Sequence, residues 1–177
     1  MTDLATLDAH GVLTEPTTLK IQRLLPGPIE RVWAFVADGE QRRQWLAAGD
    51  LPARPGQPFE LVWRNDELSH SATERPEGFA AESRATCQLL ACEPPRHLRF
   101  AWPGVGEVSF DLRPAGDGVL LTVTHIRLPD ADTATLVSAG WHQHLDILVA
   151  RAEGRAAPSF WSGVQRLRAA YAQRLGS

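Results

Sequence analysis

The first regular pattern in the chain is an alternation of hydrophobic and polar residues from Thr17 to Leu25, with Leu19 and Ile21 at even spacing. Successive side chains of a strand point to opposite faces, so this pattern predicts a strand with one buried face. Residues 1–16 carry no sustained period, and we expect them to form a flexible lead-in.

Two short helices are predicted after this strand. Pro28 can open the first helix, because the first helical position needs no backbone donor. A break at 38–39 precedes the second helix, which we expect from Glu40 to Leu46 with Trp45 facing inward.

Five further segments alternate between apolar and polar residues. The last four are joined by short turns rich in proline and glycine, which favours an antiparallel meander. The connection from Asn65 to Glu82 is long and polar, and it forms either a mobile lid or a loop that hides a weakly patterned strand. The five predicted strands are 59–64, 84–92, 97–102, 107–113 and 119–128.

Helical periods return at the C-terminal end of the chain. Residues 133–153 predict a long helix, and Ser159 to Leu175 predict a second one capped by Ser159. Because helices and strands are grouped and do not alternate, the order predicts an α+β fold. The sheet needs a cover on one face, so we expect it to curl around the long helix. The apolar face of that helix consists of Leu136, Trp141, Leu145, Leu148 and Ala152.

A sheet curled around one helix leaves a space that is either filled by side chains or kept open as a cavity. Large aromatic residues on the inward faces fit a packed core as well as a cavity wall. Histidines on the same elements favour a ligand pocket, since such pockets are apolar with a few polar groups. The candidate cavity residues are Trp63, Phe100, Trp102, Phe110, His125, Trp141, His144 and Leu148.

Composition narrows the class of protein. The 177 residues suit one domain, and 44% hydrophobic with 22% charged residues is typical of folded chains. The net charge of -3 comes without a dense basic block, which argues against nucleic acid as a partner. Neither a signal peptide nor an apolar run of membrane-spanning length is visible, so we expect a cytoplasmic protein without membrane insertion.

Recognised catalytic and metal-binding motifs are absent from the sequence. Cys87 and Cys92 are interpreted as buried small hydrophobic residues and not as a disulfide. His142 and His144 lie two apart on a helix and point in nearly opposite directions, so they cannot share a metal ion. His142 and Asp146 are expected to form a surface pair. We therefore predict no metal, no cofactor and no catalytic residue.

Several phrases in the chain resemble the START-like, or SRPBCC, superfamily with the birch-pollen-allergen helix-grip fold. Within it, the chain looks most like bacterial homologues of the heat-shock-protein-90 ATPase activator. The resemblance implies a helix-grip domain over residues 17–154. The chain departs from the family pattern in 155–177, which we expect to form an additional helix on the same domain, across the cavity mouth or against another subunit. The matching phrases run from Pro28 to Val36, Gln44 to Leu46, Glu93 to Trp102, Val119 to His125 and Gly140 to Leu148.

The leading functional hypothesis is non-covalent binding of a hydrophobic or amphipathic small molecule, lipid-like or aromatic. One alternative is an enzyme of the cyclase or aromatase type, in which His125 or His144 moves protons. Another is interaction with a chaperone, which the resemblance alone suggests. A homodimer stays open, and the abundance of alanine and arginine suggests a bacterial source.

Overall fold

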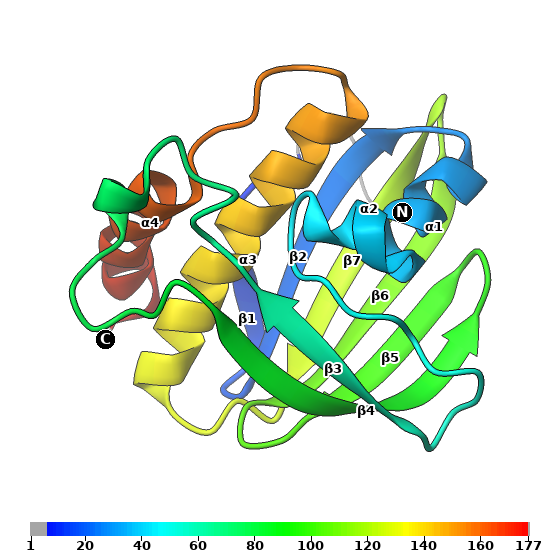
Figure 1. The fold of residues 1–177 in the computed structure, drawn as a ribbon, viewed down its shortest axis with the longest axis horizontal. Coiled ribbons are helices and arrows are strands. Elements are labelled where there is room, and N and C mark those ends of the chain that lie inside the picture. Colours follow the sequence, from blue (N-terminus) through cyan, green and yellow to red (C-terminus); the bar gives the residue numbers. More distant parts are fainter. Residues whose placement is uncertain (1–6, 177) are drawn as a thin grey trace.

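The computed structural model describes residues 7–176 and contains one seven-stranded antiparallel sheet. The strands lie in the order β1-β2-β7-β6-β5-β4-β3, so the meander runs from β3 to β7 and then returns to β2 (Figure 1). The predicted α+β class is confirmed. The strands are β1 Val12–Glu15, β2 Thr18–Pro26, β3 Pro58–Trp63, β4 Ser83–Glu93, β5 His97–Trp102, β6 Gly106–Ala115 and β7 Gly118–Ile126.

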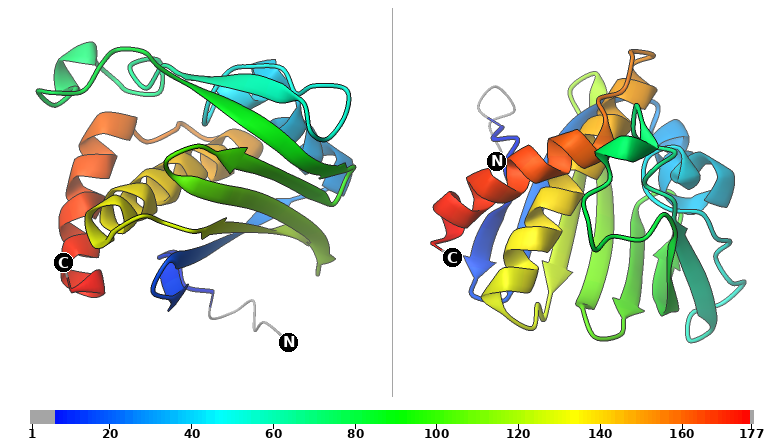
Figure 2. Two further views of the ribbon diagram at one scale, coloured as in Figure 1. Left: turned by 90° about the horizontal axis from the view of Figure 1, so that it is seen from below. Right: turned by 60° about the vertical axis from the view of Figure 1, so that its left-hand side comes forward.

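Four α-helices accompany the sheet in the described part of the chain. The long helix α3 lies in the hollow of the curved sheet, which wraps around it in Figure 2, and α4 packs against the outer side of α3. This helix-grip arrangement matches the prediction. The helices are α1 Ile29–Ala37, α2 Gly39–Arg43, α3 Ala131–Ala152 and α4 Phe160–Leu175, with a short 3₁₀ turn, η2, at Ala72–Glu74.

The expectation of a flexible lead-in before residue 17 was wrong for Val12 to Glu15, which form β1 and pair with β2. The strand is short and mostly exposed, so it lacks the alternation that would mark it in the sequence. Just before it, the Gly11 amide donates a hydrogen bond to the Tyr171 hydroxyl at 2.7 Å. The C-terminal helix α4 therefore holds the segment just before β1.

The second helix is also shorter than predicted, because α2 ends at Arg43. Trp45 is nevertheless buried, and its indole donates to the carbonyl of Phe35 at 2.8 Å. Beside it, the Arg42 guanidinium is 2% exposed and forms hydrogen bonds only to backbone carbonyls, which hold the α1–α2 corner together. These carbonyls belong to Val36, Ala37, Ala47 and Gly49.

The predicted surface pair of His142 and Asp146 was wrong in its location. His142 is 5% exposed and lies 3.4 Å from Asp146, which in turn accepts hydrogen bonds from the buried Arg23. The other ring nitrogen of His142 contacts the Tyr171 hydroxyl at 2.9 Å. Residues 8–11 and α4 cover this side of α3, so a position that is exposed on an isolated helix becomes internal.

Candidate functional site

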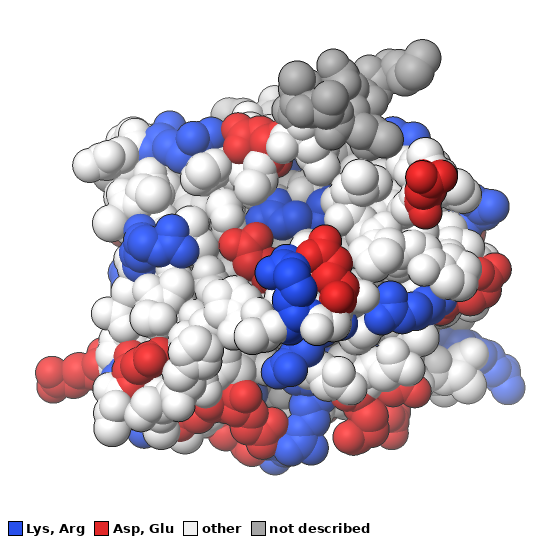
Figure 3. Space-filling model, turned by 90° about the horizontal axis from the view of Figure 1, so that it is seen from above, with Lys and Arg blue, Asp and Glu red and all other residues white. Residues whose placement is uncertain are grey.

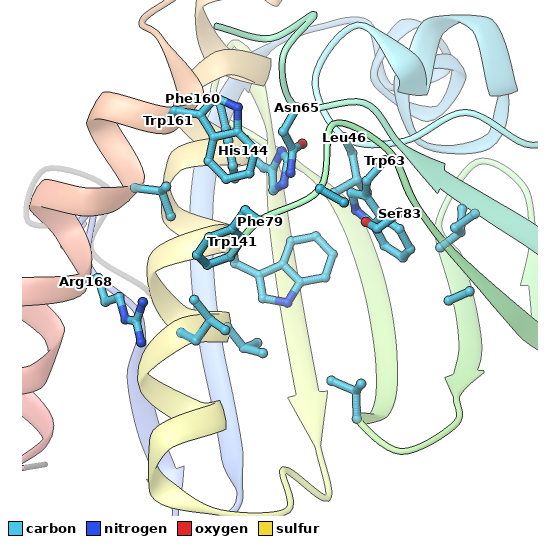
Figure 4. A pocket seen from close by; sticks show the side chains of 18 of the residues that line it. Leu46, Trp63, Asn65, Phe79, Ser83, Trp141, His144, Phe160, Trp161 and Arg168 are labelled. Carbon is cyan, nitrogen blue, oxygen red and sulfur yellow. The ribbon is translucent and has the colours of Figure 1, made fainter. Parts of the chain in front are cut away.

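A cavity of about 500 Å³ lies between the sheet, α3 and α4 (Figure 4). The strands β3 to β5 supply one wall, the middle of α3 supplies the opposite wall, and the start of α4 closes one end. Most of the lining side chains are apolar. Those that define the walls are Leu61, Trp63, Phe100, Trp102, Leu136, Val137, Trp141, Phe160, Trp161 and Val164.

Aromatic rings hold the sheet wall in shape. The indoles of Trp63 and Trp102 stack with centroids 5.0 Å apart and planes 17° apart. Behind them, the His125 ring stacks on Trp102 at 5.8 Å, and the Trp141 ring meets Phe110 edge to face at 5.7 Å. Trp141 of α3 thus packs on the sheet through Phe110 of β6, while Trp63 and Trp102 are held by each other and by His125.

Five of the eight predicted residues line this cavity and three lie behind it. Phe110 and Leu148 belong to the packed core, where Phe110 meets Trp45 edge to face at 6.3 Å. His125 is fully buried beneath Trp102 and Trp141. The lining residues are Trp63, Phe100, Trp102, Trp141 and His144.

His125 has both ring nitrogens engaged by the protein. Nε2 donates to the carbonyl of Val105 at 3.0 Å, and Nδ1 accepts from the indole of Trp141 at 3.1 Å. Burial lowers the pKa of His125 to about 4, so the ring is neutral near pH 7. This histidine positions Trp141 and has no nitrogen left for a ligand.

His144 differs because only one of its ring nitrogens is engaged. Nδ1 donates to the carbonyl of Trp45 at 2.8 Å, which leaves Nε2 as an unprotonated acceptor in the neutral ring. Burial lowers the pKa of His144 to about 4. No side chain or backbone group within residues 7–176 forms a hydrogen bond with Nε2, and the ring lines the cavity next to Phe160, with centroids 4.4 Å apart.

The loop 65–82 is neither a hidden strand nor detached from the body of the protein, since it is fastened to the start of α4. The Trp161 indole donates to Asp66 at 2.8 Å, and the Phe160 amide donates to the carbonyl of Leu68 at 2.9 Å. The His70 amide adds a bond to the Ser159 hydroxyl at 3.0 Å. Loop and helix together frame one end of the cavity.

Several lining residues were not predicted from the sequence because they belong to this loop and to α4. Phe79 was the one aromatic residue in a polar stretch, and its ring packs on Trp161 with centroids 5.4 Å apart. Phe160 was expected only as a residue of the predicted C-terminal helix. The hydrophobic pattern carries no information on which helix meets the loop, so Asn65, Phe79, Phe160 and Trp161 were missed.

Two arginines stand at the exposed mouth of the cavity. Arg84 is neutralised, with hydrogen bonds of 2.8 Å to Glu82 and 2.7 Å to Glu60. Arg168 projects from α4 toward α3 (Figure 4) and lines the cavity, and it forms no ion pair with any residue from 7 to 176. Elsewhere, acidic and basic residues are interspersed on the face shown in Figure 3.

Metal ligation and thiol chemistry find little support in the described residues. From residue 7 to 176, no three histidine, cysteine or acidic side chains gather as a metal site would require. Cys87 is buried and Cys92 half-buried, and both are free thiols. Burial raises the pKa of Cys87 to about 11, which keeps it protonated and unreactive near neutral pH. None of the helices in this part of the chain has the length and apolarity of a membrane span.

The profile of the Activator of Hsp90 ATPase homolog 1-like protein family matches residues 26–153. The chain belongs to this family. A comparison with curated proteins found no match. The family assignment and the helix-grip fold place the chain in the START-like superfamily.

Solved structures extend the similarity to the whole chain. A Bordetella parapertussis protein, solved by solution NMR, is 42% identical, with a TM-score of 0.79, over 98% of this chain and 95% of its own. CalU16 from Micromonospora echinospora is 25% identical, with a TM-score of 0.65, over 90% and 88%. DynU16, described as a putative protein in the dynemicin biosynthetic locus, shares the fold at 19% identity and a TM-score of 0.61, over 82% of this chain and 50% of its own.

The family match ends at residue 153, before α4 begins. Phe160, Trp161, Val164 and Arg168 therefore contribute to the cavity from outside the matched region. In this member of the Activator of Hsp90 ATPase homolog 1-like family, α4 completes the closed end of the cavity and supplies the free cation at its mouth.

Proposed function

We propose that this protein binds a hydrophobic or amphipathic small molecule, without covalent chemistry, in the cavity between sheet and α3. One observation carries the proposal: a cavity of about 500 Å³ stays open inside a fold whose other inward faces are packed. A concave site of this size with mostly apolar walls and a few polar groups is typical of small-molecule binding sites.

The composition of the walls supports an apolar ligand body. Indole and phenyl rings come from both sides, and Trp63, Trp102 and Trp141 present flat surfaces that suit offset stacking or edge contacts. The free Arg168 at the mouth would suit an anionic end group, which makes the ligand amphipathic. A lipid-like chain and an aromatic compound both fit this general description.

The cyclase or aromatase alternative needs a residue that moves protons. His125 is ill-suited, because both of its nitrogens are occupied by Val105 and Trp141. His144 keeps Nε2 free, but its pKa of about 4 makes it a weak base near pH 7. These observations favour binding over catalysis. The chaperone alternative has no support beyond the family description, and the cytoplasmic location and the homodimer remain predictions.

Native mass spectrometry combined with a dye titration tests the proposed function. The neutral probe N-phenyl-1-naphthylamine fluoresces in apolar surroundings, and we expect saturable binding of one molecule per chain. A ligand at a hundredfold excess over its dissociation constant should raise the free energy of unfolding by about 2.7 kcal/mol. A protein that purifies empty and gives no fluorescence with the probe would argue for a closed core and against the proposal.

A further inference from the structure

The interface between α3 and α4 contains polar groups in its interior. The Gln143 amide donates to the carbonyl of Ser159 at 3.0 Å, while Oε1 of Gln143 is buried without a hydrogen bond among the described residues. Nδ1 of His142 lies 2.9 Å from the Tyr171 hydroxyl. Buried polar groups regain hydrogen bonds to water when an interface opens. Movement of α4 away from α3 therefore costs less than the apolar residues of the interface alone would suggest.

The start of α4 is firmly fastened to the loop 65–82. Besides the bonds described above, the Trp161 amide donates to the Ser69 hydroxyl at 3.0 Å. The Ser159 hydroxyl, at the cap of the helix, donates to the Glu74 carboxylate. All of these bonds lie at the cap and in the first turn of α4, which makes this end of the helix a pivot.

The far end of α4 is held by the short segment that precedes β1. The Tyr171 hydroxyl accepts a hydrogen bond from the Gly11 amide at 2.7 Å. Arg174 lies 3.2 Å from the Asp8 carboxylate, in an exposed ion pair. Exposed ion pairs contribute little stability, so the buried Tyr171 hydroxyl is the stronger of these two contacts.

The Tyr171 hydroxyl joins three parts of the protein at one point. The Gly11 amide can only donate, so the hydroxyl accepts from it and directs its own proton at Nδ1 of His142 on α3. Arg23 ties the same segment to the sheet by donating to the carbonyl of Ala9 at 2.6 Å. Removal of this one oxygen would uncouple the end of α4 from the segment and from α3, and the packing of the ring would stay.

The part of α4 between these two attachments borders the cavity. Val164 and Arg168 line it, and Arg168 projects toward α3 (Figure 4). Both side chains lie beyond the pivot, so a rotation of the helix about its first turn would carry them away from the opposite wall. The position of α4 therefore sets the width of the cavity on this side.

We propose that α4 is a gate of the cavity, hinged at its start on the loop 65–82 and latched at its end by residues 8–11. The proposal rests on the proposed binding function and adds the control of access to the site. When the latch opens, the second half of α4 turns away from α3 and widens the path of a ligand. The latch segment and α4 both lie outside the family match at 26–153, so the gate is an addition to the family domain.

Stopped-flow mixing with N-phenyl-1-naphthylamine tests the gate through its rate constants. Tyr171→Phe deletes the latch hydroxyl and keeps the ring. A gate that opens more often lets the dye enter and leave faster by the same factor. The association and dissociation rate constants should both rise about fivefold, the effect of one buried hydrogen bond, while the dissociation constant changes by less than about twofold. A structural role alone would lower stability or weaken binding without raising both rate constants together.

Thr122→Val is the matched control. It also deletes a hydroxyl with a side-chain hydrogen bond, at 2.9 Å to Gln22, but Thr122 alternates with inward residues of β7 and faces away from α3. Both rate constants should keep their wild-type values in this variant.

Hydrogen exchange followed by mass spectrometry observes the latch without any ligand. In Tyr171→Phe, the amides of α4 beyond Arg168 should exchange about fivefold faster than in the wild type, while those of α3 keep their protection. Asp8→Ala removes the exposed ion pair to Arg174 and should act in the same direction by about twofold. This second variant tests the latch if Tyr171→Phe does not fold.

The outcomes separate the gate from the binding function. Equal acceleration of both rate constants, with faster exchange confined to the second half of α4, would establish the gate. Dye binding with wild-type rate constants in Tyr171→Phe, or unchanged exchange in α4, would overturn the gate and leave the binding function standing. A wild-type protein that takes up no dye would overturn the proposed function and the gate with it.

Discussion

Replacing either of two helical glycines by alanine should have opposite effects on stability, because one glycine borders the open cavity and the other is packed against a side chain. Gly140 lies in the middle of α3 and lines the cavity, and a β-carbon placed there meets no heavy atom within 4 Å. Gly163 lies in α4, where a β-carbon would come within 2.2 Å of the Gln143 amide. That amide also donates to the carbonyl of Ser159 at 3.0 Å, so it cannot move without losing a contact.

We expect Gly140→Ala to stabilise the protein. Alanine in place of glycine inside a helix is worth about 1 kcal/mol, and no clash offsets the gain. For a chain of this size the melting temperature should rise by about 2–4 °C. Gly163→Ala removes the same glycine penalty but forces Gln143 aside, so we expect a net loss of about 1–3 kcal/mol from overpacking. Urea unfolding followed by circular dichroism measures both.

Gly140→Phe then tests the cavity without disturbing the fold. The ring would grow into open space between α3 and the sheet, so the protein should remain folded while binding of N-phenyl-1-naphthylamine weakens at least about tenfold, the equivalent of 1.4 kcal/mol. Wild-type affinity in Gly140→Phe would refute the location of the site. A loss of stability in Gly140→Ala as large as that in Gly163→Ala would refute the claim that the space beside Gly140 is open.

Three further predictions concern buried and rim charges. Arg42→Ala should lower the free energy of unfolding, measured in urea, by more than about 3 kcal/mol, because several buried carbonyls lose their donor together. A decrease below about 1 kcal/mol would contradict the role of Arg42 at the α1–α2 corner. Burial lowers the pKa of His125 and of His144 from 6.5 to about 4, so the unfolded chain takes up protons first as the pH falls. The free energy of unfolding should therefore fall from about pH 6.5 toward pH 4. In His125→Gln the slope of this free energy against pH should correspond to about one proton fewer taken up on unfolding; an unchanged slope would contradict the prediction. Arg168→Gln should weaken the anionic dye 8-anilinonaphthalene-1-sulfonate about threefold to tenfold without affecting the neutral N-phenyl-1-naphthylamine, while Arg166→Gln, exposed on the same helix, should change neither; equal effects on both dyes would rule out a charge contact.

The strands and the long helix could be predicted from the sequence because their periods are strong and local. β5 matches its predicted range, and β4, β6 and β7 differ from theirs only at the ends. β1 escaped because it is short and mostly exposed, and the preceding Gly11 is held by Tyr171 of α4, far along the chain. No local pattern carries that information.

The sequence predicts which faces of the strands and of α3 point to the interior, but not which residues on those faces line the cavity. Phe100 and Phe110 both alternate inward, yet Phe100 lines the cavity while Phe110 is packed against Trp45. Alternation identifies the face of a strand, whereas the position along the strand relative to α3 decides between wall and core. His142 shows the same limit on a helix, since its burial follows from α4 and residues 8–11 covering that side of α3.

The six tryptophans offer the most direct test of ligand binding in the cavity. Each indole N–H gives one signal in a ¹⁵N-correlated NMR spectrum, and single Trp→Phe variants assign them. On titration with N-phenyl-1-naphthylamine, we expect shifts for the four indoles that line the cavity and none for Trp33 and Trp45, which lie outside the lining. Saturation without change at Trp63, Trp102, Trp141 and Trp161, or with change confined to Trp33 and Trp45, would contradict a ligand site between the sheet and α3.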